Sequence, residues 1–190
     1  MPIKPHPDFG EIIQAIQRLS GKGKAFSGVC YRCTEPQYLD QIISGLGSQL
    51  HGARWTPKNS FPTVYLCDTI EAALQEYLAR ARRMKLPDHK SLPMMMAWVK
   101  VKAVNLLDST DAEVAEVITP FLARDKIHWR AIQDRREAVS QAIGRAIKDV
   151  CFSGIIASSQ ALPGGRNLVI FPQKLRATDS LSAPKLEPMV

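Results

Sequence analysis

The sequence predicts a single domain of mixed α/β (α+β) class. The chain has 190 residues, 45% of them hydrophobic, which is enough to bury one core of ordinary size. Segments with helical periodicity alternate with segments of strand composition, without a strict βαβ repeat. No internal repeat and no low-complexity linker divides the chain, so one domain is expected.

The first third of the chain predicts a helix, a strand, a short helix and a second strand. Within residues 8–24, apolar side chains recur at helical spacing and stop at glycines, and a strand follows at 25–32. A short helix is predicted at 35–47, which has a proline near its start and glycines past its end. Residues 61–67, FPTVYLC, are rich in β-forming side chains and predict the second strand.

A long helix is predicted over residues 68–87, where Asp68 and Glu71 form a D-x-x-E capping signature. Its apolar side chains follow the i, i+3, i+4 spacing of one buried face: Ile70, Ala73, Leu74, Tyr77, Leu78 and Ala81. Glu76 lies opposite this face. The sequence therefore predicts one buried side and one polar side for this helix.

The second half predicts a strand, two helices and two further strands. Residues 94–108 alternate between polar and apolar side chains, as in a half-buried strand. Residues 111–123 and 128–150 both have helical periodicity. The apolar runs at 153–159 and 167–172 predict two strands, joined by a glycine-rich loop.

Charge and cysteine content limit the function classes. The chain carries 25 Lys and Arg against 18 Asp and Glu, a net charge of +7 that suits an anionic ligand, a nucleic acid or an acidic partner. The basic cluster ARARRMK at 79–85 predicts a solvated helix face. Cys30 and Cys33 have C-x-x-C spacing, but the second pair of a zinc site is missing, so no metal is expected. The scattered cysteines do not predict a disulfide framework.

No run approaches the roughly 20 apolar residues that a membrane span needs, and the N-terminus lacks the apolar stretch of a secretory signal. A cytoplasmic protein is therefore expected.

Several polar residues have two interpretations. Glu76, flanked by alanines, could line a cleft, although helix geometry favours an exposed i, i+4 pair with Arg80. Taken singly, Arg54 and Arg32 are ordinary surface arginines, and Tyr65 is an ordinary core aromatic.

The order of these residues resembles the RES domain family, which is named for an arginine, a glutamate and a serine. Tyr65 lies eleven positions after Arg54, and Glu76 lies eleven positions after Tyr65. The resemblance covers residues 28–172 and is carried by GARW (52–55), VYL (64–66), ALQEYL (73–78), NLLDST (105–110), QAIGRAI (141–147), GIIASS (154–159) and GGRNLVIF (164–171).

The resemblance implies a compact, ADP-ribosyltransferase-like domain with a split central β-sheet flanked by helices and a cleft for a dinucleotide. On this basis residues 26–172 are expected to form the catalytic domain. Residues 1–25 would be a helical segment packed on it, and residues 173–190 a loosely ordered tail.

The implied activity is that of an NAD-degrading toxin of a bacterial toxin–antitoxin pair, either a glycohydrolase or a phosphorylase. NAD is then a substrate, inorganic phosphate is a candidate co-substrate, and no cofactor is implied. The absence of a G-x-G-x-x-G motif agrees with a site that consumes NAD and transfers no hydride.

The resemblance also assigns site residues. Arg54, Tyr65 and Glu76 match the catalytic arginine, tyrosine and glutamate of the family. The family serine falls on Ser158 or Ser159, and the spacing of the motif favours Ser159.

Each assigned residue has an expected role. Arg54 would grip the diphosphate in bidentate fashion, with Arg32 as a helper. Tyr65 would stack on nicotinamide or ribose while its hydroxyl fixes orientation, and the serine would bind a phosphate or ribose oxygen. Glu76 would stabilise the positive charge that develops on the ribose. The serine is not expected to be a nucleophile, because no histidine is arranged as in a catalytic triad.

The implied partners are NAD and a cognate antitoxin. Neither a membrane nor direct binding of nucleic acid is expected, and homo-oligomer formation stays open. Two alternatives remain: transfer of ADP-ribose to a macromolecule, and a non-catalytic basic binding module, motivated by the net charge of +7 and the cluster at 79–85.

Overall fold

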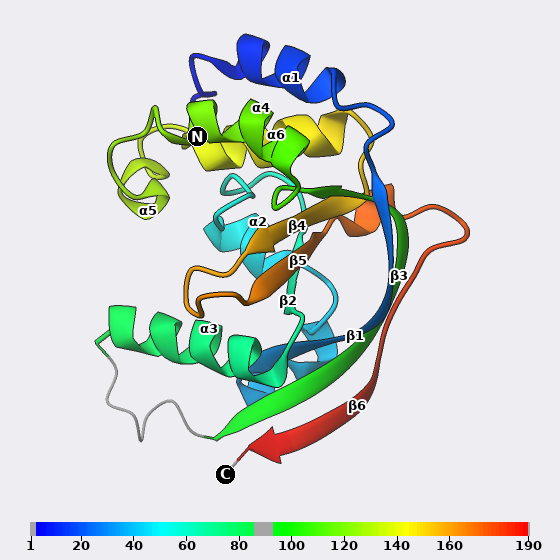
Figure 1. Cartoon of the computed structure of the whole chain (residues 1–190). Coiled ribbons are helices and arrows are strands. Elements are labelled where there is room, and N and C mark those ends of the chain that lie inside the picture. Colours follow the sequence, from blue (N-terminus) through cyan, green and yellow to red (C-terminus); the bar gives the residue numbers. More distant parts are fainter. Residues whose placement is uncertain (1–2, 86–92, 190) are drawn as a thin grey trace.

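The computed structural model describes residues 3–85 and 93–189 and contains one six-stranded sheet (Figure 1). The strand order is β1-β2-β5-β4-β3-β6, and an additional pairing joins β1 to β3. The strands are β1 (Lys24–Thr34), β2 (Val64–Cys67), β3 (Met94–Asp108), β4 (Gly154–Ser158), β5 (Arg166–Ile170) and β6 (Ser180–Met189).

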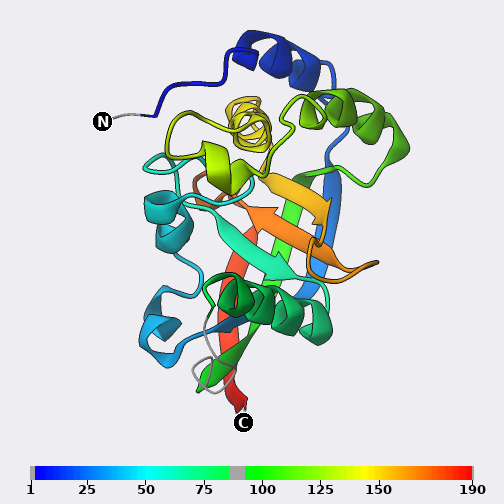
Figure 2. The ribbon, with the colours of Figure 1, turned by 90° about the vertical axis from the view of Figure 1, so that its left-hand side faces the viewer.

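The sheet is split into two parts that share the long strand β3. Over most of its length β3 pairs antiparallel with β1 on one side and β6 on the other. Its last residues, Leu106 to Asp108, instead pair parallel with β4. The three long strands curve past the short strands β2, β5 and β4 (Figures 1 and 2). This arrangement agrees with the predicted α/β (α+β) domain with a split sheet.

Helices cover two ends of this sheet. Helices α1, α4 and α6 lie together at the top of Figure 1, and α3 lies against β1 and β2 at the lower end. The helical elements are α1 (Phe9–Gln17), η1 (Pro36–Gln41), α2 (Leu46–His51), α3 (Ile70–Arg83), α4 (Ala112–Leu122), α5 (Trp129–Ile132), α6 (Val139–Asp149) and η3 (Pro172–Lys174). Among the described residues, no helix is long and apolar enough to span a membrane.

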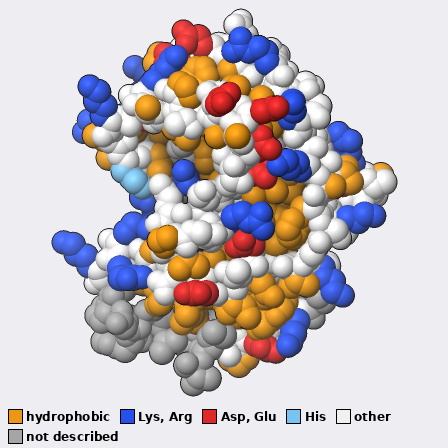
Figure 3. Space-filling model, in the orientation of Figure 1, with side chains coloured by type: hydrophobic (Ala, Val, Ile, Leu, Met, Phe, Trp, Pro, Cys, Tyr) orange, Lys and Arg blue, Asp and Glu red, His pale blue; other side chains and the backbone are white. Residues whose placement is uncertain are grey.

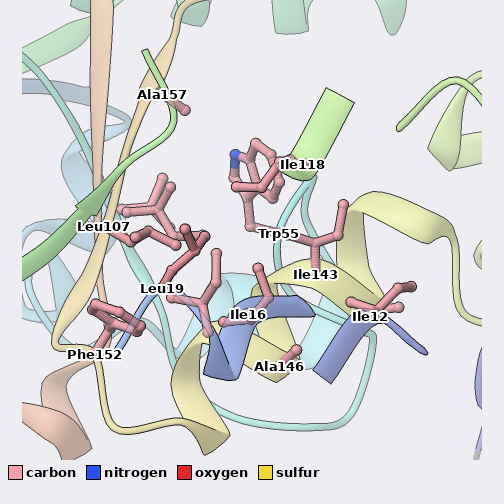
Figure 4. Packing of buried hydrophobic residues seen from close by; sticks show 14 of the residues in the cluster. Ile12, Ile16, Leu19, Trp55, Leu107, Ile118, Ile143, Ala146, Phe152 and Ala157 are labelled. Atoms are coloured by element: carbon pink, nitrogen blue, oxygen red, sulfur yellow. The ribbon is translucent and has the colours of Figure 1, made fainter. Parts of the chain in front are cut away.

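The larger core cluster lies between the upper helices and the sheet. Figure 4 shows Ile12 and Ile16 of α1 packed with Ile143 and Ala146 of α6, next to the buried ring of Trp55. Burial of each large aliphatic side chain contributes about 1.5–3 kcal/mol. The N-terminal helix therefore shares the main core of the domain.

Three predicted helices differ from those in the structure. The predicted helix 128–150 is two helices, α5 and α6. Side chains accept the backbone hydrogen bonds where α6 begins: Val139 N–H donates to Asp125 (2.6 Å), and Ala138 N–H, at the N-cap, donates to Gln141 (3.1 Å). The predicted helix 35–47 is the 3₁₀ helix η1, after which a left-handed Gly45 begins α2.

The predicted helix 68–87 begins one residue later than its capping signature suggests. Thr69 accepts the capping hydrogen bond from Ala72 N–H (3.1 Å), whereas the Asp68 carboxylate binds Arg166. Helix α3 ends at Arg83, and the last two residues of the predicted range lie outside the described residues.

The expectation of a loosely ordered tail at 173–190 is wrong for residues 180–189. These residues form β6, which pairs along β3 with Trp98 opposite Lys185 and Val101 opposite Leu181. The segment carries prolines, which an edge strand tolerates. Its partners on β3 lie 78 positions away at Lys102 and Ser180 and 95 positions away at Met94 and Met189, so local composition could not reveal the strand.

The C-x-x-C pair does not form a ligand pair. Cys30 belongs to the buried cluster between the sheet halves, whereas Cys33 packs in a different cluster beside α3. An offset of three positions on a strand places side chains on opposite faces. Both thiols are free.

A buried polar network ties the N-terminal segment to the loop before α6. His6 N–H donates to the Glu137 carboxylate (2.9 Å), and His6 Nδ1 accepts from Asp8 N–H (3.2 Å). The imidazole Nε2 lies 3.9 Å from Asp125 Oδ1. Burial lowers the pKa of His6 below its ordinary value of 6.5; Arg136 lowers this pKa further, and the nearby carboxylates partly oppose the shift.

This network predicts a loss of stability at mildly acidic pH. Because the folded pKa of His6 is depressed, the unfolded chain binds more protons as pH falls below 6.5, and the free energy of unfolding decreases. In His6→Asn, which keeps an acceptor for Asp8 N–H, we expect a flatter dependence between pH 7 and 5. Urea unfolding at several pH values measures this, and parallel curves for variant and wild type would contradict it.

Candidate active site

A cleft opens between the C-terminal half of α3 and the α5 segment, at the left of Figure 3. It consists of two adjoining cavities of about 250 Å³ and about 160 Å³ that share Tyr65, Glu76, Arg80 and Asn167. The larger cavity is also lined by basic side chains, and the smaller one by Tyr31, Tyr77 and two cysteines. Glu76 therefore lies where a charged chamber meets a more apolar one.

The Glu76 carboxylate is held by two side chains from other elements. Its Oε1 accepts hydrogen bonds from Ser159 Oγ (2.7 Å) and from Asn167 Nδ2 (2.9 Å). Within residues 3–85 and 93–189, no hydrogen bond reaches its Oε2. One oxygen is thus anchored to the protein, while the other receives no hydrogen bond from the described residues, and Glu76 lines both cavities.

The surface pair between Glu76 and Arg80 that helix spacing favoured is not formed. Arg80 lies 3.7 Å from Glu35 instead, and Glu76 turns toward β4 and β5. The alternative interpretation, in which Glu76 lines a cleft, describes its position.

The structure distinguishes the two candidate serines. Ser159 Oγ accepts from the backbone amides of Ala161 (3.1 Å) and Leu162 (3.2 Å), which leaves its proton for Glu76. Ser158 contributes its backbone carbonyl instead, which accepts from Arg54 Nη1 (3.2 Å). Of the two serines, only Ser159 contacts the Glu76 carboxylate.

Arg54 reaches the cleft from a tight turn between Ala53 and Thr56. Each of these two residues donates its N–H to the carbonyl of the other, at 2.9 and 3.2 Å. Gln141 of α6 donates to both carbonyls, at 3.1 and 3.2 Å. Gly144, one turn later, lies against the carbonyl of Trp55, where there is no space for a Cβ atom. The QAIG motif therefore shapes the turn that presents Arg54.

Tyr65 supports the same turn. Its hydroxyl accepts from Trp55 N–H (3.0 Å) and bonds Thr56 Oγ1 (3.0 Å). Burial raises the pKa of Tyr65 to about 12, so the hydroxyl stays protonated at neutral pH. The Tyr65 hydroxyl is thus bonded to the loop, whereas the family resemblance predicts that it orients a ligand. Tyr65 still lines both cavities.

Cationic side chains gather on both sides of the larger cavity (Figure 3). Arg80 and Arg83 come from α3, and Arg130 from the α5 segment, where it lies over the Trp129 ring at 4.4 Å. His128 also lines this cavity, as an uncharged imidazole at neutral pH. Burial and the neighbouring arginines lower the pKa of His128. Such crowding of like charges produces a positive potential that favours an anion.

The basic cluster at 79–85, expected to be a solvated face, is thus partly a wall of the cleft. Arg82 points elsewhere and donates to Gln75 (3.2 Å) and to the carbonyl of Leu78 (3.4 Å). Arg80 and Arg83 remain exposed while lining the larger cavity.

Arg32 lines the smaller cavity, although one of its hydrogen bonds is structural. Its Nη1 donates to the carbonyl of Ile42 (2.9 Å). Burial lowers the pKa of the guanidinium, and Arg80 adds to this shift. A partly desolvated guanidinium of this kind favours an anionic neighbour.

Sequence reasoning did not single out Asn167, Arg83 or Arg130. Asn167 lies within GGRNLVIF, one of the motifs that carry the family resemblance, and that motif could have pointed to it. Arg83 was noted only as part of the basic cluster at 79–85, and Arg130 had no signal of its own, because only the approach of α3 and α5 places them together. Among the described residues, no group of three His, Cys, Asp or Glu side chains could hold a metal ion.

Comparisons with known proteins identify the family and the fold of this chain. The family model "RES domain" matches residues 29–188. NAD(+) phosphorylase MbcT from Mycobacterium tuberculosis, and likewise from Mycobacterium bovis, is 27% identical over 158 residues, which cover 82% of this chain and 78% of the relative. The crystal structure of the M. tuberculosis MbcT-MbcA toxin-antitoxin complex contains a chain of the same fold, with a TM-score of 0.72 and 23% identity over 94% of this chain and 91% of that one.

Proposed function

This chain belongs to the RES domain family, and from that premise we propose that it degrades NAD by cleaving the bond between nicotinamide and ribose. The observation that carries the proposal is the anchored Glu76 carboxylate, with one oxygen free, in a cleft otherwise rich in guanidinium groups. A mycobacterial relative with 27% identity is named an NAD(+) phosphorylase, which supports the same substrate.

The substrate has a charge distribution that complements the cleft. Its diphosphate carries two negative charges, which suit Arg54 and the arginines of the larger cavity. Its nicotinamide is a flat ring, which suits the smaller cavity with Tyr31, Tyr77 and Tyr65. The ribose would then lie between the two chambers, next to Glu76.

The reaction requires little acid catalysis. Nicotinamide leaves as a neutral molecule, because the electron pair of the broken bond neutralises its pyridinium nitrogen. Positive charge develops on the ribose at the same time, and a carboxylate in a partly desolvated site stabilises such an oxocarbenium-like state. We assign this role to Glu76, whose free oxygen can face the ribose or hold one of its hydroxyls.

The acceptor and the partner follow from the relatives. Attack by a phosphate oxygen on the ribose carbon yields ADP-ribose 1″-phosphate, and attack by water yields ADP-ribose. The name of the relative favours phosphate. The solved complex of the same fold contains an antitoxin, so the proposal includes an antitoxin as the partner that restrains this chain as a toxin.

The proposal is tested by incubating the purified protein with NAD, with and without inorganic phosphate, and by identifying the products by chromatography. We expect nicotinamide in both samples if water can serve as acceptor, and in the phosphate sample alone if it cannot. No nicotinamide under either condition would refute the proposal. Radiolabel from adenine-labelled NAD that remains on a macromolecule would indicate ADP-ribose transfer instead.

Arg54→Ala is expected to weaken NAD binding. Charge-assisted hydrogen bonds to phosphate contribute about 1.5–3 kcal/mol, so kcat/KM should fall about 10- to 100-fold, mainly through KM. Arg82→Ala removes a neighbouring guanidinium that points away from the cleft and should leave KM unchanged. Steady-state kinetics on both variants decide this, and equal effects would show that only the overall charge matters.

A further inference from the structure

Strands β2 and β5 place a thiol beside Asn167, and both residues line the smaller cavity of the cleft. Cys67 on β2 and Asn167 on β5 are direct partners in the register of the two strands. Cys67 Sγ lies 3.3 Å from Asn167 Oδ1, and Asn167 Nδ2 lies 2.9 Å from Glu76 Oε1. These contacts form a chain of hydrogen bonds from the thiol through the amide to the carboxylate.

We propose that Cys67 is a positioning residue, whose thiol holds the Asn167 amide with its NH₂ group turned toward Glu76. This proposal rests on the proposed NAD-cleaving function for its kinetic part, while its structural part is independent of any substrate.

The direction of these hydrogen bonds follows from the chemistry of the thiol, the amide and the carboxylate. A carboxylate only accepts hydrogen bonds, and a carboxamide has one accepting end and one donating end of nearly equal shape. If the amide were rotated by half a turn, its oxygen would face the Glu76 carboxylate and its NH₂ would face a sulfur atom, which is a weak acceptor. The thiol at one end and the carboxylate at the other therefore both select the same orientation.

The surroundings keep the thiol in its donating form. Cys67 is buried in a cluster with Ala72, Ala73 and Met96, and its side chain is 7% exposed. Burial raises the pKa of the Cys67 thiol, and the charge of Glu76 adds to that shift. The thiol thus stays protonated at neutral pH.

This series of hydrogen bonds matters because it saturates one oxygen of the Glu76 carboxylate. With Ser159 and Asn167 both donating to Oε1, the Glu76 carboxylate has a defined rotation, and Oε2 is the oxygen that receives no hydrogen bond from the described residues. Without the thiol donor, only the contact with the Glu76 carboxylate would still hold the Asn167 amide in this orientation. A rotated amide would then displace the carboxylate by placing two acceptors in contact.

Cys67→Val and Cys67→Ser separate the donor from the packing. Valine is similar in size but cannot donate, so we expect kcat for NAD cleavage to fall about three- to tenfold with KM little changed. Serine keeps a donor, and its kcat should stay within about twofold of wild type. Cys30→Val, at a buried thiol outside the cleft, is the matched control and should keep the wild-type kcat.

A second measurement does not depend on activity. The side-chain NH₂ signals of Asn167 in a ¹H–¹⁵N spectrum, identified by their loss in Asn167→Asp, should shift in Cys67→Val and stay close to wild type in Cys67→Ser. An inactive wild-type protein with this pattern would refute the NAD function but support the positioning role. An unshifted signal in Cys67→Val, or equal impairment of Cys67→Ser and Cys67→Val, would overturn the inference.

Discussion

Glu76→Gln is expected to abolish nicotinamide release while leaving the protein folded. The glutamine side chain has the same shape, and its amide oxygen can still accept from Ser159 and Asn167. It has no negative charge to stabilise the ribose cation, so kcat should fall about 10²- to 10⁴-fold. Chromatographic measurement of nicotinamide over time gives this ratio, and the melting temperature reports on the fold.

The control for this variant lies on the same helix. Glu71→Gln removes an exposed carboxylate from the first turn of α3, outside the cavities, and should keep close to the wild-type rate. Nearly unchanged NAD cleavage in Glu76→Gln would remove Glu76 from the mechanism. In that case the cleft could still bind a dinucleotide through its arginines, but a different group would have to stabilise the transition state.

Gly144→Ala is expected to have the largest effect on stability. An ideal Cβ at this position would lie 1.9 Å from the carbonyl oxygen of Trp55 and 2.7 Å from its carbonyl carbon. Both are backbone atoms, so either α6 or the turn carrying Arg54 must move. Overpacking of this kind costs about 3 kcal/mol or more, which corresponds to a decrease in melting temperature of about 6–12 °C for a domain of this size.

The same displacement should also reduce activity. The turn that clashes with the new methyl group is the one that presents Arg54, so kcat/KM should fall together with the melting temperature. Gly10→Ala is the matched control, because this glycine lies in helix α1 with no atom near its would-be Cβ. Alanine there should be neutral or slightly stabilising. An unaltered melting temperature in Gly144→Ala would show that α6 can shift at little cost.

Residue spacing predicted some features of the site and not others. The spacing of Arg54, Tyr65 and Glu76 identified three residues that line one cleft. It did not reveal that Tyr65 serves the Arg54 turn through its hydroxyl, nor that Asn167 shares the carboxylate with Ser159. These facts depend on side-chain direction and on contacts between elements, which a one-dimensional pattern does not contain.

The local pattern of side chains determined the type of most elements, β6 being the strand that it missed. The alternation of residues 98–103 predicted a half-buried strand, and the structure buries Val99, Val101 and Ala103 while exposing Lys100 and Lys102. Such periodicity is a property of a few consecutive residues, because a strand repeats every two positions and a helix every 3.6. The sequence by itself therefore determined the α/β class, the family and the buried face of β3. On α3 the predicted buried face is only partly right, because Ile70 is 42% exposed and Ala72, which the prediction left out, is fully buried.

Tertiary structure alone decided which distant residues meet. Glu76 is 83 positions from Ser159 and 91 from Asn167, and strand β6 pairs with β3 although its composition resembles a loose terminus. Such contacts form only when the whole sheet closes, since the entropy cost of joining distant segments is offset by burial shared across the domain. The cleft, its anchored carboxylate and the thiol beside Asn167 are consequences of that closure.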